Sequence, residues 1–221
     1  MTIRLKKSLG QHFLSSPAII KKIAGAGEVV SGESVLEIGP GEGTLTRELL
    51  SRGARVIAVE KDDRLIPVLN KKFQNEILSG KLTIIHEDIL KFDPAQGDLQ
   101  ATRYKLIANI PYYITGAIIR KFLESRCPPE RMVLLVQSEV AERIVGKGGK
   151  ESVLSISVKA YGKPRLCFTV RRGAFSPVPR VDSAVVAIED ISKKFFDTVS
   201  KNRFFETVKK GFGSKRKLLS N

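Results

Sequence analysis

The sequence Glu37-Ile38-Gly39-Pro40-Gly41-Glu42-Gly43 has a glycine at every second position from Gly39, at the end of a predicted strand, Val35–Ile38. Glycine lets the backbone turn sharply and approach a bound molecule, because it has no Cβ atom. Cofactors of open α/β sheets bind at this place, outside the carboxyl end of a strand. Thr44 stands where a dinucleotide fingerprint needs its third glycine, and no Lys-Ser/Thr pair follows as in a P-loop. Taken alone, the run is equally compatible with a plain strand-to-helix turn.

Apolar runs alternate with segments of helical spacing on both sides of this glycine run. We predict strands at Val35–Ile38, Val56–Val59, Leu82–His86, Lys105–Ala108 and Met132–Gln137, and helices from Ser16 to about Gly25 and at Thr44–Ser51, Arg64–Phe73 and Thr115–Ser125. Continuous apolar runs indicate strands that are buried on both faces, and the alternation of strands with helices indicates a parallel sheet.

The pattern continues beyond Gly149 with a predicted helix, Ser152–Tyr161, and with strands near Arg165–Val170 and Ala184–Ile188. A loop that contains prolines joins these two strands, which can pair as a terminal antiparallel unit. From Lys193 onward the chain is a basic amphipathic segment with several phenylalanines.

The composition indicates one domain in a reducing compartment. The chain has 221 residues, 42% of them hydrophobic, which is enough for a single core with a small appendage. It has no apolar run long enough to span a membrane, and no apolar stretch follows the basic N-terminus as in a signal peptide. Cys127 and Cys167 have no metal-ligand pattern around them, and we interpret them as buried thiols. We therefore expect a cytoplasmic monomer without a metal and without a membrane partner.

The charge of the chain favours a polyanionic partner. The formal net charge is +15, and residues 1–27 and 152–181 carry five and six basic side chains without one acid. Residues 193–217 add nine basic residues against two acidic ones. Neutralising phosphates releases counterions, so such blocks favour binding to nucleic acid. A merely solvated surface is the alternative for any one block.

Two acidic residues end the second and third predicted strands. Glu60 lies 17 residues after Gly43, where an acid can hold the two ribose hydroxyls of an adenosine. Asp88 follows the third strand, where a carboxylate can accept a hydrogen bond from an adenine amino group. Either acid alone can be a helix N-cap. The glycine run and both acids at consecutive strand ends, without a phosphate-binding lysine, predict the nucleoside cofactor S-adenosylmethionine.

The sequence Asn109-Ile110-Pro111-Tyr112 ends the fourth predicted strand. The N6 amine of adenine is a poor nucleophile, because its lone pair is delocalised into the ring. The Asn109 side-chain oxygen and the Ile110 carbonyl can accept hydrogen bonds from both N–H groups, while Pro111 offers no competing donor. The Tyr112 ring can stack on an unstacked base. A structural turn is the alternative.

The loop Phe175-Ser176-Pro177-Val178-Pro179-Arg180-Val181-Asp182-Ser183 begins with an aromatic residue and is stiffened by two prolines. Arg171, Arg172 and Arg180 border it and can hold phosphates. We predict that Phe175 stacks on the other face of a flipped base. The alternative is a rigid connection with Phe175 in the core.

These motifs, together with Lys7-Ser8-Leu9-Gly10-Gln11-His12-Phe13-Leu14 and Glu87-Asp88, resemble the ribosomal RNA adenine N6,N6-dimethyltransferase family. The resemblance extends from residue 6 to about residue 190, in the same order and spacing. It implies a Rossmann-like, seven-stranded S-adenosylmethionine-dependent methyltransferase fold of the α/β class, mostly parallel with an antiparallel end. His12 stands where many relatives have asparagine.

The resemblance also implies roles for individual residues. It places cofactor contacts at His12, Leu14, Gly39, Glu60, Asp88 and Asn109, to which the glycine run adds Gly41. It assigns the target base to Asn109, Tyr112 and Phe175, and it implies that the Leu9–Leu14 run closes over the cofactor. We expect in-line methyl transfer without a metal, and Asn109, Ile110, Tyr112 and Phe175 as the catalytic residues.

The run Gln137-Ser138-Glu139-Val140-Ala141-Glu142-Arg143 resembles the branch of the family that acts on small-subunit (16S) RNA. That branch implies dimethylation of two adjacent adenines in the 3′-terminal hairpin loop during ribosome biogenesis. Three alternatives stay open: a large-subunit (23S) enzyme of macrolide resistance, a mainly non-catalytic assembly factor that binds RNA, and a DNA adenine methyltransferase. We predict a methyltransferase domain at residues 1–190 and, at 191–221, a basic helical segment that starts a shortened C-terminal domain.

Overall fold

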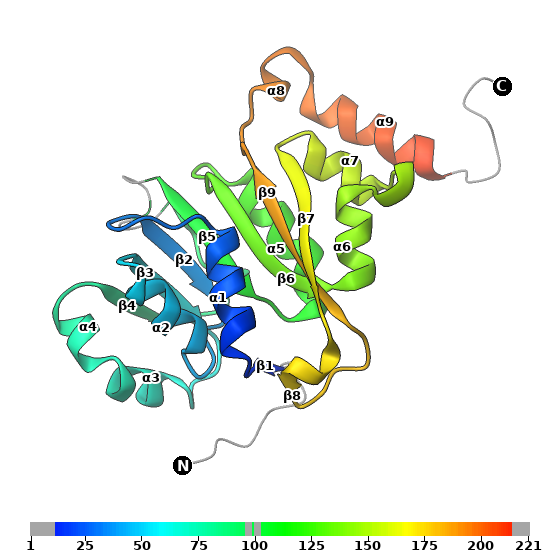
Figure 1. The fold of residues 1–221 in the computed structure, drawn as a ribbon. Helices are drawn as coiled ribbons and strands as arrows, with labels where there is room; N and C mark the ends of the chain where they lie inside the picture. The colour runs from blue at the N-terminus through cyan, green and yellow to red at the C-terminus, as the bar shows by residue number, and fades with distance from the viewer. Residues whose placement is uncertain (1–11, 96–98, 100–102, 214–221) are drawn as a thin grey trace.

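A seven-stranded sheet forms the centre of the protein in the computed structural model, which describes residues 12–95, 99 and 103–213 (Figure 1). Its strands follow the order β4-β3-β2-β5-β6-β9-β7. Their bounds are Ser34–Ile38 (β2), Arg55–Glu60 (β3), Leu82–His86 (β4), Tyr104–Asn109 (β5), Arg131–Gln137 (β6), Lys163–Val170 (β7) and Ser183–Glu189 (β9). The five strands predicted before Gly149 and the two predicted after it are all present.

The sheet is parallel except at one end. Strands β4, β3, β2, β5 and β6 pair in parallel, and β9 runs antiparallel to both β6 and β7. The carboxyl ends of β2, β3, β4 and β5 therefore lie at one edge of the sheet. This confirms the predicted α/β fold, mostly parallel with an antiparallel end.

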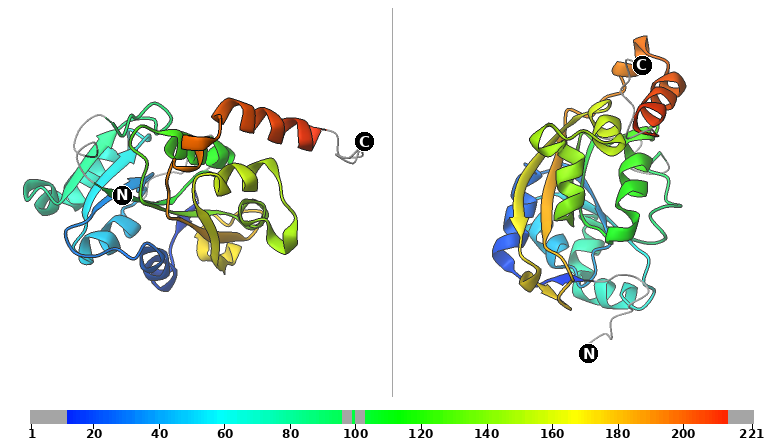
Figure 2. Two further views of the ribbon diagram at one scale, coloured as in Figure 1. Left: turned by 90° about the horizontal axis from the view of Figure 1, so that it is seen from above. Right: turned by 90° about the vertical axis from the view of Figure 1, so that its right-hand side faces the viewer.

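Alternating side chains of the strands enter two separate cores. Along β6, Met132 and Leu134 pack in one cluster while Val133 and Leu135 pack in the other. Helices α1 (Pro17–Ala26), α2 (Thr44–Ser51) and α3 (Ile66–Lys72) cover one face, and α5 (Thr115–Glu124), α6 (Ser138–Val145) and α7 (Val153–Lys159) cover the other. Figure 2 gives two further views of these layers. Burial of both faces explains why the strands are continuous apolar runs.

Helix boundaries follow the predicted signals to within a few residues. Pro17 is the first helical residue of α1, after an extended Ser16, since proline needs no hydrogen-bond partner there. Ser152 begins α7 with a capping box, in which its side chain accepts from the backbone N–H of Ser155. The shorter elements are α4 (Gln74–Leu78), η2 (Tyr112–Ile114), η3 (Lys147–Gly149) and η4 (Arg172–Ala174).

Two features were not predicted. Helix α6 begins directly at the end of β6, without a glycine or proline between them. A two-stranded antiparallel sheet joins β1 (Phe13–Leu14) to β8 (Phe175–Ser176), with Leu14 opposite Phe175. This small sheet attaches the N-terminal segment to the proline loop more than 150 residues later in the chain.

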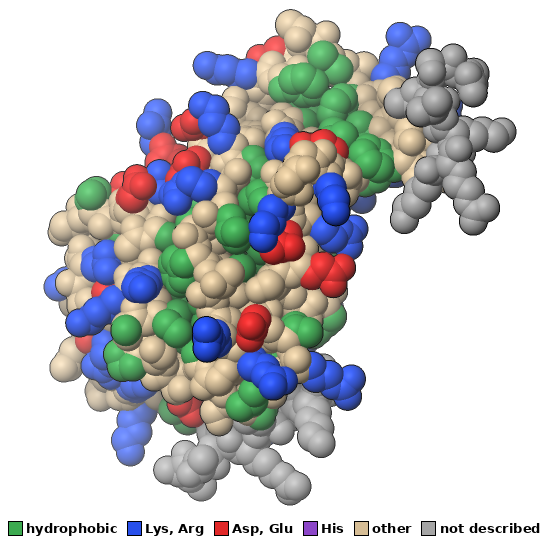
Figure 3. All heavy atoms as spheres, turned by 45° about the vertical axis from the view of Figure 1, so that its right-hand side comes forward, with side chains coloured by type: hydrophobic (Ala, Val, Ile, Leu, Met, Phe, Trp, Pro, Cys, Tyr) green, Lys and Arg blue, Asp and Glu red, His purple; other side chains and the backbone are tan. Residues whose placement is uncertain are grey.

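The C-terminal segment folds back on the domain. Helices α8 (Phe195–Thr198) and α9 (Lys201–Gly213) bring Phe196 and Phe205 against Tyr161, with ring centroids 4.9 and 6.5 Å away. Lys201 also pairs with Glu124 at 3.1 Å. Figure 3 shows apolar side chains gathered at this end of the molecule. The predicted helix is present over 201–213, residues 214–221 lie outside the described part, and the domain boundary at 190 stays a prediction.

None of the helices in the described ranges is both long and apolar enough to cross a membrane.

Candidate active site

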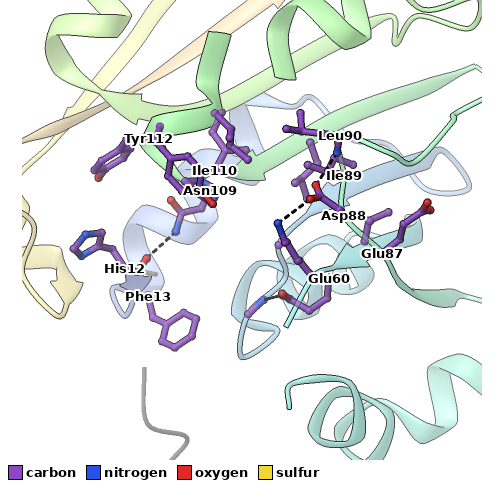
Figure 4. Close-up of a pocket in the computed structure, with 18 residues that line it drawn as sticks. His12, Phe13, Glu60, Glu87, Asp88, Ile89, Leu90, Asn109, Ile110 and Tyr112 are labelled. Atoms are coloured by element: carbon purple, nitrogen blue, oxygen red, sulfur yellow. Dashed lines mark hydrogen bonds and ion pairs between the residues drawn. The ribbon is translucent and has the colours of Figure 1, made fainter. Parts of the chain in front are cut away.

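A cavity of about 160 Å³ opens at the carboxyl ends of β2, β3, β4 and β5 (Figure 4). Its lining brings together most of the residues that the sequence singled out. They are His12, Gly39, Gly41, Glu60, Asp88, Asn109, Ile110 and Tyr112. The parallel register places these strand ends side by side, so the site follows from the fold.

The glycine run turns between β2 and α2 in a conformation that only glycine adopts easily. Gly39, Gly41 and Gly43 have φ angles of +63°, +58° and +76°. A Cβ atom on Gly41 would lie 2.7 Å from the Phe13 ring, and one on Gly43 would lie 2.4 Å from the Phe73 ring. The turn therefore needs glycine for its backbone and for the close approach of two aromatic rings.

Glu60 holds this turn from the end of β3. One of its carboxylate oxygens accepts a hydrogen bond from the Gly41 N–H at 3.1 Å, and the other accepts from the Asp62 N–H at 2.8 Å. Burial raises the pKa of Glu60, while these backbone hydrogen bonds act in the opposite direction. Glu60 is 5% exposed and lies on the cavity wall, where its carboxylate can accept a further hydrogen bond from a ligand.

Asp88 follows β4 and has a cationic neighbour inside the site. Its Oδ2 accepts a hydrogen bond from the Lys61 ammonium at 2.7 Å, and its Oδ1 accepts from the Leu90 N–H at 3.0 Å. The hydrogen bond from Lys61 holds the pKa of Asp88 below its usual value. Asp88 is therefore an ionised acceptor at neutral pH.

Asn109 ends β5, and its amide orientation is fixed by one hydrogen bond. The side-chain Nδ2 donates to the backbone carbonyl of His12 at 3.1 Å. A carbonyl oxygen only accepts, so the nitrogen must face His12 and the side-chain oxygen must lie on the other side of the amide. Figure 4 shows this bond between β5 and the N-terminal segment.

Tyr112 lies near Asn109, and both its hydroxyl and its ring contact other side chains. The hydroxyl lies 2.6 Å from the Ser183 hydroxyl, and burial raises the pKa of the phenol. The His12 ring is nearly parallel to the Tyr112 ring, at 17°, with centroids 6.0 Å apart. The His12 Nδ1 also lies 2.8 Å from the Pro177 carbonyl oxygen.

A second cavity of about 40 Å³ lies next to the first and shares Phe13, Gly39 and Asn109 with it. Leu14 and Glu37 line it. Burial raises the pKa of Glu37 to about 8, and one of its carboxylate oxygens is buried without a hydrogen-bond partner. Sequence reasoning gave Glu37 no role, although it begins the glycine run.

Phe175, which we predicted to stack on the target base, lies beside the two cavities and lines neither of them. Its ring is 3% exposed and packs in the core cluster that contains Leu14 and Val185. The pairing of β8 with β1 turns this side chain inward, because alternate residues of a strand face opposite sides. The ring is therefore in the core in this structure, and its stacking on a target base stays a prediction.

Several residues of the cavity were not singled out by sequence reasoning. Lys61 is the neighbour of Glu60, Phe13 lies against Gly41, and Tyr113 is 64% exposed at the cavity. Tyr113 follows the Asn109–Tyr112 motif directly, so position was a usable signal. Phe13 belongs to the Leu9–Leu14 run that the resemblance placed over the cofactor, but its contact with Gly41 depends on the distant β1–β8 pairing. Residues 1–11, with the first part of the Lys7–Leu14 motif, lie outside the described residues.

Known proteins that are similar to this chain in sequence are named as ribosomal RNA methyltransferases. The family model described as ribosomal RNA adenine dimethylase matches residues 2–221. The ribosomal RNA small subunit methyltransferase A of Dehalococcoides mccartyi strain CBDB1 is 46% identical over 220 residues, which cover 100% of this chain and 75% of that protein. The protein of the same name from Clostridioides difficile is 38% identical over 99% of this chain and 76% of its own length.

Two solved structures share the fold and a substantial part of the sequence. A dimethyladenosine transferase from Plasmodium falciparum superposes with a TM-score of 0.79 at 33% identity, over 94% of this chain and 73% of its own. The 23S rRNA methyltransferase ErmE has a TM-score of 0.79 at 30% identity, over 92% of this chain and 80% of its own.

The fold, the cavity at the strand ends and these relatives define a methyltransferase. The chain belongs to the ribosomal RNA adenine dimethylase family.

Proposed function

We propose that this chain transfers methyl groups from S-adenosylmethionine to the N6 amines of two adjacent adenines in small-subunit ribosomal RNA, two to each. The observation that carries the proposal is the single cavity that joins Glu60 and Asp88 to the Asn109–Tyr112 turn. It offers acceptors for a nucleoside at one end and for an amine at the other. The names of the relatives from Dehalococcoides mccartyi and Clostridioides difficile support the small subunit as the target.

The residues at the ends of β2, β3 and β4 fit the proposed cofactor. Glu60 can accept a further hydrogen bond from a ribose hydroxyl, and Asp88 is an ionised acceptor for an adenine amino group. Glu37 has an unpartnered buried oxygen in the adjoining cavity, where an ammonium group would satisfy it. When bound, S-adenosylmethionine supplies a methyl group that its sulfonium makes electrophilic.

The Asn109–Tyr112 turn would act on the target amine. The Asn109 side-chain oxygen, turned away from His12 by the amide hydrogen bond, accepts one N6 hydrogen, and the Ile110 carbonyl accepts the other. These bonds draw the nitrogen lone pair out of the ring and toward the methyl group. Tyr112 holds the base by stacking, with its hydroxyl fixed on Ser183. Catalysis then comes from orientation and from acceptors aimed at developing positive charge.

The surface charge supports ribosomal RNA as the partner. The side chains of Arg171, Arg172 and Arg180 are exposed, and the net charge of the chain is +15. Such side chains position a phosphate backbone without reading its sequence. We propose that the protein works as a monomer in the cytoplasm, which suits its two free cysteines.

The large ribosomal subunit is the second candidate target. The fold of the 23S rRNA methyltransferase ErmE matches this chain as well as that of the Plasmodium falciparum dimethyladenosine transferase, with a TM-score of 0.79 for both. The two candidates share all the chemistry described above and differ only in the RNA. Incubation with radiolabelled S-adenosylmethionine and separate unmethylated small and large subunits tests them. The small subunit should take up the label, and label in the large subunit alone would favour the second candidate.

A further inference from the structure

Tyr113 is a large aromatic residue of the cavity that the proposed mechanism does not use. It lies in η2, directly after the Asn109–Tyr112 turn, and lines the same cavity as Asp88. Its neighbour Tyr112 is partly buried, whereas Tyr113 is 64% exposed. Packing in the core therefore does not account for an aromatic ring at this position.

The end of the cavity at Asp88 has an aliphatic wall and an exposed margin. Ile38, Val59 and Ile89 form the wall, and each is at most 5% exposed because it also belongs to a core cluster of the sheet. Leu90 is 40% exposed at the margin, next to Asp88 and Ile89 (Figure 4). An adenine whose amino group is held by Asp88 would bury one face on the aliphatic wall and need another side chain to cover the second face.

Tyr113 belongs to this end of the cavity as well as to the turn that it follows. Lys61, the partner of Asp88 in the ion pair, has its pKa raised chiefly by that carboxylate, and the Tyr113 phenol acts in the same direction. The phenol of Tyr113 and the ammonium of Lys61 are therefore near one another, and both line the cavity.

An exposed aromatic ring beside an aliphatic wall suits a flat purine, because bases stack on aromatic side chains and bury apolar area against them. We propose that the Tyr113 ring stacks on the adenine of bound S-adenosylmethionine and is a further cofactor-binding residue. The aliphatic wall contacts one face of the adenine, and Tyr113 covers the other. Two consecutive tyrosines then serve the two substrates, Tyr112 the target base and Tyr113 the cofactor. This inference rests on the proposed function.

A single fluorophore can report on this contact, because the chain contains no tryptophan. In a Tyr113→Trp variant, titration with adenosine or with S-adenosylhomocysteine should quench the fluorescence in a saturable way. Titration with methionine alone should not, since it lacks the base. Phe195→Trp is the matched control, because Phe195 is 43% exposed on α8 and lines neither cavity. Its fluorescence should not respond to adenosine.

Calorimetry measures what the ring contributes to affinity. Tyr113→Ala should raise the dissociation constant for S-adenosylmethionine about tenfold, within the ~5- to 150-fold range that corresponds to the stacking of one base. Tyr113→Phe should stay within about twofold of the wild type, because it keeps the ring and loses only the hydroxyl. Phe195→Ala should leave the constant unchanged. At saturating cofactor, KM of Tyr113→Ala for the small subunit should also stay within about twofold.

Three results would overturn the inference in a wild-type protein that binds S-adenosylmethionine. They are an unchanged cofactor affinity in Tyr113→Ala, an equal loss in Tyr113→Phe, or fluorescence of the Tyr113→Trp variant that does not respond to adenosine. An unchanged cofactor affinity together with a raised KM for the small subunit would assign the ring to the RNA. A wild-type protein that does not bind S-adenosylmethionine would instead overturn the proposed function, and this inference with it.

Discussion

The ammonium of Lys61 lies 2.7 Å from the carboxylate of Asp88, so two consecutive strand ends are joined by an ion pair at the wall of the active-site cavity. Lys61 directly follows Glu60 in the chain. The side chain of Lys61 is 55% exposed and that of Asp88 is 23% exposed, so solvent screens the pair. Its main consequence is that Asp88 stays ionised and oriented at the cavity wall, as the proposed contact with an adenine amino group requires.

Replacement of Asp88 by alanine should weaken the binding of S-adenosylmethionine by about 1–3 kcal/mol, the scale of a lost charge-assisted hydrogen bond. Isothermal titration calorimetry measures this directly. Glu87 is the matched control, because it is a neighbouring carboxylate that also lines the cavity. A folded Asp88→Ala variant with unchanged affinity, or a larger loss in Glu87→Ala, would remove Asp88 from the cofactor site.

Asn109→Ala should act on the rate of methyl transfer more than on binding, because the proposed contact strengthens as charge develops on N6. We expect a single-turnover rate lower by about 10²–10³-fold, as for the loss of one group that stabilises a developing charge. Asn202→Ala, an exposed asparagine on α9, should behave as the wild type. A near-normal rate in Asn109→Ala would contradict the mechanism.

Glu37 should make the stability of the fold depend on pH. Its pKa is about 8 in the folded protein and its ordinary value is 4.5, so between these values the folded state holds a proton that the unfolded state has lost. The free energy of unfolding should therefore fall as pH rises through this window, by up to ~1.4 kcal/mol per pH unit. Urea denaturation between pH 6 and pH 8 should show this slope in the wild type and a flatter one in Glu37→Gln. Equal slopes would show that Glu37 is already ionised at pH 6.

Binding of the cofactor should also change the protonation of Glu37. If an ammonium group pairs with Glu37, binding favours the carboxylate and should release protons near neutral pH. Calorimetric titrations in buffers of different ionisation enthalpy detect such a release. It should be smaller in Glu37→Gln, and an equal release in both proteins would place the ammonium elsewhere.

Phe175 should now be tested as a core residue. Phe175→Ala should lower the free energy of unfolding by about 3–5 kcal/mol, since it leaves a cavity under the β1–β8 pairing. Val178→Ala is the matched control, because Val178 is 59% exposed in the same loop and should change stability by less than ~0.5 kcal/mol. A Phe175→Ala variant with wild-type stability and weakened RNA binding would instead support the stacking role predicted from the sequence.

The sequence predicted the part of the site that depends on the periodicity of strands. Glu60, Asp88 and Asn109 each end an apolar run, and parallel strands bring their carboxyl ends together, so their convergence followed from local pattern alone. Helix α6 was missed because Ser138 continues the chain from β6 without a turn signal.

The rest of the site depends on contacts that no local pattern encodes. Leu14 pairs with Phe175 across 161 positions of the chain, and this pairing sets the inward direction of Phe175 and the position of Phe13 against Gly41. An aromatic residue before two prolines is compatible with either an exposed or a buried ring. The ion pair of Lys61 with Asp88 likewise needs two strands in register before it can be seen.

The identity of the methylated nucleoside tests the central claim most directly. Small subunits from cells that lack this modification, incubated with the protein and S-adenosylmethionine, can be digested to nucleosides and analysed by mass spectrometry, with fragments mapped to the RNA. The account predicts N6,N6-dimethyladenosine at two adjacent positions of small-subunit RNA, strongly reduced with Asn109→Ala. Methylation of a base other than adenine, or dimethyladenosine formed only in large-subunit RNA, would contradict it.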